Sequence, residues 1–175
     1  DFTVAMEILA KAPIYIDDTP GLSIMEMKSK CRRLKAEGKL DMIIIDYLQL
    51  MNTEGRADSR TQEVSILTRN LKLLARELDC PVIVLSQLSR APEQRTDHRP
   101  MLADLRESGS IEQDADIVLF LYRDDYYNKE SEALGECEVI IAKQRSGSTG
   151  TVRVAWLDKI TKFVDSAGSG SFGGF

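Results

Sequence analysis

No apolar stretch of the sequence approaches the roughly 18 residues that a membrane-spanning helix needs. The first residues, Asp1 to Thr3, also lack the basic and then apolar layout of a signal peptide. The cysteines Cys31, Cys80 and Cys137 are odd in number, far apart and without C-x-x-C spacing, so neither a disulfide framework nor a zinc site is indicated. These absences predict a soluble cytoplasmic protein with no membrane association.

A phosphate-binding loop of the form G-x-x-x-x-G-K-[ST] is missing as well. The Gly38-Lys39 pair is followed by Leu40, and Arg33 stands where the first glycine of such a loop would be. No other stretch of the sequence can supply this loop. Any nucleotide chemistry would therefore need a phosphate cradle from outside these 175 residues.

Size and charge set further bounds. A chain of 175 residues, 43% of them hydrophobic, suffices for one domain with a sizeable core but not for two. The net charge of −5 argues against a globally basic nucleic-acid-binding protein, although a local basic loop can still contact phosphates. We expect one domain over residues 1–165 and a flexible tail over residues 166–175, which are rich in glycine and serine.

Two short apolar runs, residues 42–45 and 81–85, are each followed by polar residues. Unbroken apolar runs are typical of strands that helices cover on both faces in a parallel sheet. The first run leads to Asp46 and the second to Gln87. Because ligands bind at the carboxyl ends of parallel strands, these two side chains mark a candidate site.

The remaining pattern predicts an α/β fold, a mostly parallel, helix-flanked sheet that ends in an antiparallel meander. Ser23 and Glu26 predict a capping box at the start of one helix, and Gly38 its end. Helices are predicted at residues 2–11, 23–38 and 59–78, a short strand at 14–17, a third core strand at 117–121, and meander strands at 139–142, 152–156 and 162–164.

Asp46 fits a Walker B carboxylate, which orients the water shell of a nucleotide-bound Mg²⁺, because a hard divalent ion prefers oxygen ligands. The alternative is an aspartate that merely ends a strand and caps a loop. Gln87 fits a neutral amide that contacts a γ-phosphate or orients the attacking water, and the alternative is a strand-end turn residue.

Two other segments carry cations that suit phosphates. Residues 104–114 combine Arg106 with the flexible Gly109, which could bring a guanidinium and a backbone N–H to a phosphate; a solvated loop with Ser110 as a helix N-cap fits equally well. Lys143 and Arg145 lie where a hairpin tip is predicted. They could form an arginine finger for a neighbouring subunit's nucleotide, or be ordinary solvated hairpin charges.

Taken together, several motifs resemble the bacterial replicative DNA helicases of the DnaB family, which have a RecA-like motor domain. The resemblance runs from Ile14 to about Val164, in the family's order and spacing. Its motifs are Ile44 to Met51, Ser86 to Arg90, Asp104 to Asp116 and Lys143-Gln144-Arg145.

The resemblance implies roles for these residues. Asp46 would be the Walker B aspartate, bound to Mg²⁺ through water, and Gln87 the glutamine that senses the γ-phosphate of ATP. Arg106, Glu107 and Gly109 would contact the single-stranded DNA backbone. Lys143 and Arg145 would reach the ATP of the adjacent subunit in a homohexameric ring. The resemblance also implies a primase and a helicase loader as partners.

The chain departs from the family because the Walker A strand and loop and the catalytic glutamate would lie before Asp1. An isolated segment of this kind is expected to be inactive, to expose sheet edges and apolar faces, and so to associate with itself or be completed by another chain. A non-enzymatic binding or scaffolding remnant of a RecA-like ATPase is the main alternative. A related recombinase or phage helicase–primase is another.

Overall fold

The computed structural model describes residues 2–53 and 59–166, and of residues 106–108 it describes the backbone but not the side chains. The described chain forms two compact units, which divide between Gln87 and Leu88. The expectation of one domain over residues 1–165 stays a prediction. Most of the expected tail, residues 167–175, lies outside the described residues.

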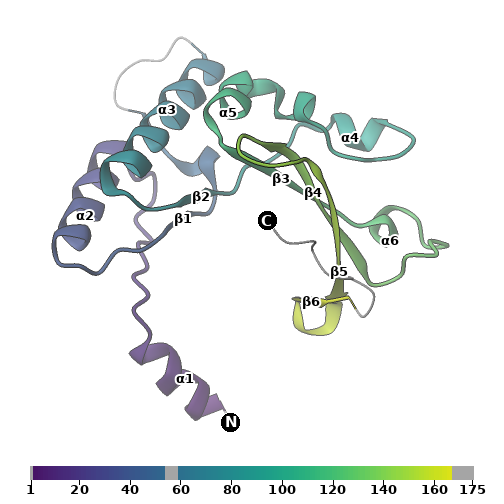
Figure 1. Cartoon of the computed structure of the whole chain (residues 1–175), viewed down its shortest axis with the longest axis horizontal. Helices are drawn as coiled ribbons and strands as arrows, with labels where there is room; N and C mark the ends of the chain where they lie inside the picture. The colour runs from purple at the N-terminus through teal and green to yellow at the C-terminus, as the bar shows by residue number, and fades with distance from the viewer. Residues whose placement is uncertain (1, 54–58, 167–175) are drawn as a thin grey trace. The chain divides into compact units, whose positions relative to one another are not determined.

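The first unit combines helices with a short parallel sheet (Figure 1). Strands β1 and β2 pair in parallel, with Ile44 opposite Ile83, as the sequence predicted. Helix α2 packs against α3, and α3 also contacts β2 and η1. The elements are α1 (Phe2–Lys11), α2 (Ile24–Ala36), β1 (Ile43–Ile45), η1 (Leu48–Leu50), α3 (Arg60–Leu78) and β2 (Val82–Val84).

Local signals explain where the two packed helices begin. The Ser23 hydroxyl accepts a hydrogen bond from the Glu26 N–H at 3.2 Å, and the Glu26 carboxylate accepts one from the Ser23 N–H at 3.1 Å. This confirms the predicted capping box, which satisfies backbone donors that the first helical turn leaves free. Ser59 caps α3 in the same way by accepting from the Gln62 N–H at 3.3 Å.

The predicted strand at residues 14–17 is wrong. This segment has no regular secondary structure, and Ile16 is 87% exposed. A strand needs a neighbour for its backbone N–H and C=O groups, and none of the described strands pairs with it. Helix α1 just before it buries no residue. Within the described residues, no helix is long and apolar enough to cross a membrane.

The second unit is built on an antiparallel sheet with the strand order β3-β4-β5-β6, which confirms the predicted meander. The third core strand belongs to this sheet and not to the parallel pair. The elements are α4 (Ala91–Gln94), η2 (Leu102–Ser108), α5 (Gly109–Asp114), β3 (Ile117–Tyr122), α6 (Asp124–Tyr127), β4 (Glu136–Gln144), β5 (Gly150–Leu157), η3 (Asp158–Ile160) and β6 (Lys162–Asp165).

Strand β3 alternates between exposed and buried side chains, although its unbroken apolar sequence predicted burial on both faces. Val118 and Phe120 point into a core that includes Leu105 of η2 and Ile111 of α5. The opposite face of β3 leaves Ile117, Leu119 and Leu121 more than half exposed. In the first unit, Ile44 and Ile83 form a second exposed apolar pair across β1 and β2.

We expect the isolated 175-residue chain to associate with itself as its concentration rises, because burying these strand faces removes apolar surface from water. Sedimentation velocity over a concentration series measures this association. Leu119→Lys should weaken it. Leu134→Lys should not, because Leu134 is exposed but lies outside the sheets. A chain that stays monomeric at every concentration contradicts the expectation.

Candidate functional site

Asp46 and Gln87 lie in the first unit, just beyond the carboxyl ends of the paired strands β1 and β2. The ladder continues past β2, since the Leu85 N–H donates to the Ile45 carbonyl at 2.9 Å. The chain therefore brings both residues to one edge of the parallel pair, as the sequence predicted. Both side chains are exposed.

Gln49 of η1 links the two strand ends, and sequence reasoning assigned it no role. Its Oε1 accepts from the Gln87 N–H at 3.2 Å, and its Nε2 donates to the Ser86 hydroxyl at 3.1 Å. These bonds hold the backbone at Gln87, whose side chain makes no hydrogen bond to the described part of the chain. The only sequence signal was an amide residue three positions after the strand-end aspartate.

The donor set at this edge suits a nucleotide-bound magnesium ion. Within the described residues, the Asp46 carboxylate makes no hydrogen bond or ion pair, so its oxygens are available as ligands or water acceptors. In the same part of the chain, no three His, Cys, Asp or Glu residues cluster as a metal site. Mg²⁺ commonly binds through one carboxylate, several waters and substrate phosphates, and Asp46 fits that pattern.

The second unit holds the candidate DNA-contact segment, residues 102–114, which comprises η2 and α5. The side chains of Arg106 and Glu107 lie outside the described residues. Gly109 begins α5 with an ordinary helical φ of −49°, and a Cβ there would meet nothing within 4 Å. Among the described atoms, neither backbone conformation nor packing demands glycine at this position. The expected Ser110 N-cap is wrong, because α5 begins one residue earlier.

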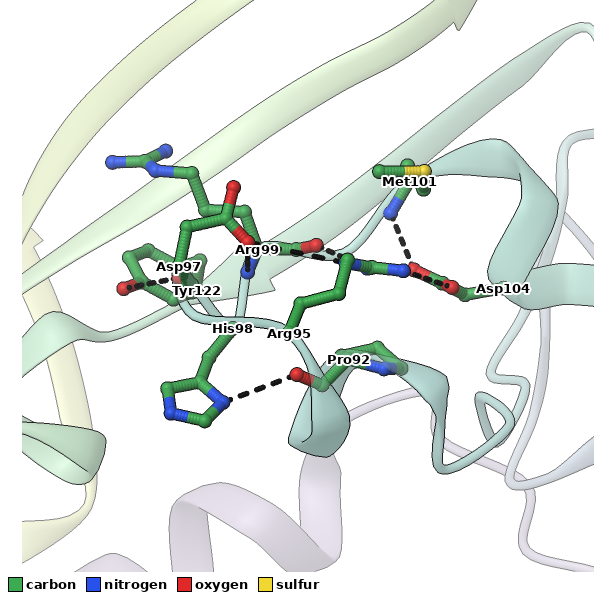
Figure 2. A network of polar contacts seen from close by, with 8 residues as sticks. All are labelled: Pro92, Arg95, Asp97, His98, Arg99, Met101, Asp104 and Tyr122. Atoms are coloured by element: carbon green, nitrogen blue, oxygen red, sulfur yellow. Dashed lines mark hydrogen bonds and ion pairs between the residues drawn. The ribbon is translucent and has the colours of Figure 1, made fainter.

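A buried carboxylate anchors the start of this segment (Figure 2). Asp104 is 2% exposed. Its carboxylate accepts hydrogen bonds from Arg95 Nη1 at 2.8 Å, from Arg95 Nη2 at 2.5 Å and from the Met101 N–H at 2.7 Å. Hydrogen bonding from Arg95 lowers the pKa of Asp104 below its ordinary value, although burial opposes this shift. The carboxylate thus ties η2 to the loop that precedes it.

A second pair fastens the same loop to the sheet. Arg99 binds the Glu138 carboxylate of β4 at 2.6 and 2.9 Å, and its guanidinium lies 4.6 Å from the centroid of the Tyr122 ring. The Tyr122 hydroxyl donates to the Asp97 carbonyl, and burial raises the pKa of Tyr122 to about 12. The sequence of this loop showed no periodicity, and its order comes from these long-range contacts.

Lys143 and Arg145 contact the other end of the segment. Lys143 is not at a hairpin tip but within β4, where its ammonium donates to the Glu112 carbonyl and, at 2.8 Å, to the Ala115 carbonyl. Arg145 is half exposed and donates to the Gln113 carbonyl at 2.7 Å. The structure therefore joins the expected finger residues to the expected DNA-contact segment, a link that sequence reasoning missed.

Known proteins are similar to this chain over most of its length. The family described as "DnaB-like helicase C terminal domain" matches residues 1–165. The chain is 61% identical over 164 residues to the replicative DNA helicase DnaB of Geobacillus stearothermophilus, and equally to the replicative DNA helicase DnaC of Bacillus subtilis strain 168. Each alignment covers 93% of this chain but only 36% of the relative, so the chain spans about a third of their length.

Solved structures are similar over nearly the whole chain. One of them, described as an ATPase domain, matches with a TM-score of 0.90 and 51% identity, covering 94% of this chain and 58% of that one. A DnaB-like replicative helicase, described with its interactions with primase, matches with a TM-score of 0.88 and 52% identity over 93% of this chain and 39% of that one. These likenesses extend to a RecA-like ATPase fold.

Asp104→Asn is expected to lower the free energy of unfolding by about 2 kcal/mol, because it leaves the Arg95 guanidinium without its carboxylate and cannot satisfy every donor. Urea denaturation of both chains at neutral pH measures the loss. Asp165→Asn is the matched control, since Asp165 is exposed and has no side-chain partner in the described part of the chain.

The same pair predicts a pH dependence. The pKa of Asp104 is lowered in the folded protein, so its contribution is fully present above the ordinary value of 3.8 and is lost as pH falls through the lowered folded value. Wild type and Asp104→Asn should therefore differ fully at neutral pH and converge in acid. An equal difference at all pH values would show that the charge of Asp104 is not what stabilises the unit.

Proposed function

Because the chain belongs to the DnaB-like helicase C-terminal domain family, we propose that it forms part of a replicative DNA helicase motor. This motor couples ATP hydrolysis to translocation on single-stranded DNA and to duplex unwinding at the replication fork. The observation that carries the proposal is the convergence of Asp46 and Gln87 at one end of the β1–β2 pair, where neither side chain has a partner among the described residues. Parallel α/β sheets bind their ligands at this edge.

Each of these side chains has a proposed part in ATP hydrolysis. Bound Mg²⁺ supplies positive charge that offsets the charge developing on the phosphates. Asp46 accepts hydrogen bonds from the water shell of that ion and so fixes its position. Gln87 donates to the γ-phosphate or orients the attacking water, and Gln49 holds its backbone in place. The phosphate-cradling loop and the catalytic glutamate come from outside these 175 residues, so the isolated chain is inactive.

In this proposal, residues of a neighbouring subunit contact the other side of the nucleotide. We place Lys143 and Arg145 at the ATP of the adjacent protomer in a homohexamer, where a planar guanidinium stabilises charge on the transferring phosphoryl group. The Arg145 side chain is 49% exposed, which leaves it accessible to a partner. In the described part of the chain, its guanidinium contacts the Gln113 carbonyl and, at 3.6 Å, the exposed Asp116 carboxylate.

DNA binds, in this proposal, through Arg106, Glu107 and Gly109. Contacts to the phosphate backbone carry no sequence information and weaken with salt, which suits an enzyme that must move along any strand. No described atom lies within 4 Å of where a Cβ of Gly109 would stand, which suits a close approach to its backbone. One structural relative is described with primase, and we propose a primase and a helicase loader as further partners.

In the complete helicase that contains this chain, Arg145→Ala is expected to lower the ATPase rate by about a thousandfold, because one finger arginine is worth roughly this factor. ATP binding should persist, since the phosphates are still held by the other subunit. Steady-state turnover and titration with a fluorescent ATP analogue separate the two effects.

Arg153→Ala provides the control for charge. Arg153 lies on β5 with a 65% exposed side chain, and its one ion pair within the described residues is a 3.7 Å contact to Glu136, so its loss should leave turnover unchanged. Wild-type turnover in Arg145→Ala would remove the finger assignment.

One observation favours a non-enzymatic alternative, namely the missing Walker A motif. A binding or scaffolding remnant of a RecA-like ATPase would keep the helicase surface without its chemistry. The native size of the polypeptide decides between them, and an immunoblot of the source cell measures it. The helicase proposal predicts a band well above 19.6 kDa, whereas a single band at 19.6 kDa would favour the remnant.

A further inference from the structure

Cations hold the candidate DNA-contact segment at both ends, a guanidinium at its start and an ammonium at its end. At its start, Arg95 pairs with the buried Asp104 carboxylate. At its end, the ammonium of Lys143 hydrogen-bonds the carbonyls of Glu112 and Ala115, and it lies 3.5 Å from that of Gln113. The expected DNA contacts, Arg106, Glu107 and Gly109, lie between these two attachments.

A bulge in the sheet directs Lys143 to this position. Val118 of β3 pairs with Lys143, but Leu119 pairs with Ile141, so β4 has one extra residue, Ala142. Without the bulge, strict alternation along β4 would place Lys143 on the same face as Ile141, which is the face of the exposed Leu119. The bulge instead places Lys143 across from the buried Val118, on the face that α5 covers.

The Lys143 contacts matter because α5 is short. It has six residues, fewer than two turns, and such a helix has little stability of its own. The last carbonyls of a helix have no partner within it, and here Lys143 supplies donors to them. Loss of these bonds therefore loosens α5 as a whole, including Gly109 at its first position.

We propose that Lys143 is a positioning residue for the DNA-contact segment, and that its ammonium exchanges between the α5 carbonyls and the nucleotide phosphates of the neighbouring subunit. This inference rests on the proposed function, which places Lys143 at that nucleotide. One side chain then links the two sites. ATP bound by the neighbour withdraws Lys143 from α5 and changes how residues 106–109 are presented to DNA.

The exchange needs no change in the chemistry of the contact, because both sets of partners are oxygen acceptors for the same ammonium. Lysine reaches either on a flexible stem and needs no fixed plane of donors. By linkage, if nucleotide and α5 compete for Lys143, then nucleotide changes DNA affinity and DNA changes nucleotide affinity by the same factor.

The test measures single-stranded DNA binding by the complete helicase, with and without saturating Mg²⁺ and a non-hydrolysable ATP analogue. The ratio of the two Kd values is the coupling factor. In Lys143→Met, we expect this factor to approach one, falling at least about threefold from the wild-type value. The nucleotide-free variant should bind DNA as the nucleotide-bound wild type does.

Two further variants separate a positioning role of Lys143 from direct contact with DNA. Arg106→Ala should reduce the salt dependence of DNA binding by a slope of about 0.7, the value for one phosphate contact on a single strand. Lys143→Met should leave that slope unchanged. Lys162→Met removes an exposed lysine of β6 with no side-chain partner in the described residues, and it should change neither quantity.

Hydrogen exchange tests the release of α5 without any variant. In the wild-type ring, backbone amides of residues 109–116 should exchange faster with the analogue bound than without it. Unchanged exchange would overturn the proposal. So would a Lys143→Met ring that loses ATPase activity but keeps the wild-type coupling factor, or one whose salt slope falls. A wild-type ring that binds neither ATP nor DNA would instead refute the proposed function itself.

Discussion

Almost no solvent reaches the Asp104 carboxylate, so its negative charge must be matched by groups inside the protein. Arg95 supplies a bidentate pair, and the Met101 N–H supplies a further donor. The loop before η2 must therefore fold back onto η2, and Arg99 then fastens that loop to Glu138 of β4. The start of the candidate DNA-contact segment is thus fixed to the sheet through two carboxylates.

The parts of this fold that local chemistry determines could be predicted from the sequence. The runs that became β1 and β2, the capping box at Ser23 and the meander each have a local signal. The expected strand at residues 14–17 failed because a strand also needs a neighbour, which its own residues do not reveal. Register is hidden for the same reason, so the bulge at Ala142 could not be foreseen from β4 alone.

The candidate site also contains residues that the sequence could predict and residues that it could not. Asp46 and Gln87 could be expected to lie together, because parallel strands end at one edge of a sheet. Gln49 could not be identified, since its role depends on a hydrogen bond to a backbone 38 positions along the chain. The sequence placed Lys143 and Arg145 at a hairpin tip, whereas Lys143 lies in β4 and both contact carbonyls around the end of α5. Their roles at a neighbouring nucleotide rest on the family resemblance.

Arg95, Lys143 and Arg145 bind different kinds of acceptor, and the kind of acceptor decides how readily each cation can move to a phosphate. Arg95 is committed to a buried carboxylate, and separating such a pair leaves an uncompensated charge, which is costly. Lys143 binds neutral carbonyls, and the Arg145–Asp116 contact at 3.6 Å is about half exposed on both sides, where ion pairs contribute little. An anionic phosphate is a stronger acceptor than a carbonyl for the same ammonium. Under the proposed function, the second unit thus combines a permanent ion pair at the start of the segment with exchangeable contacts at its end, where a nucleotide would compete for the cation.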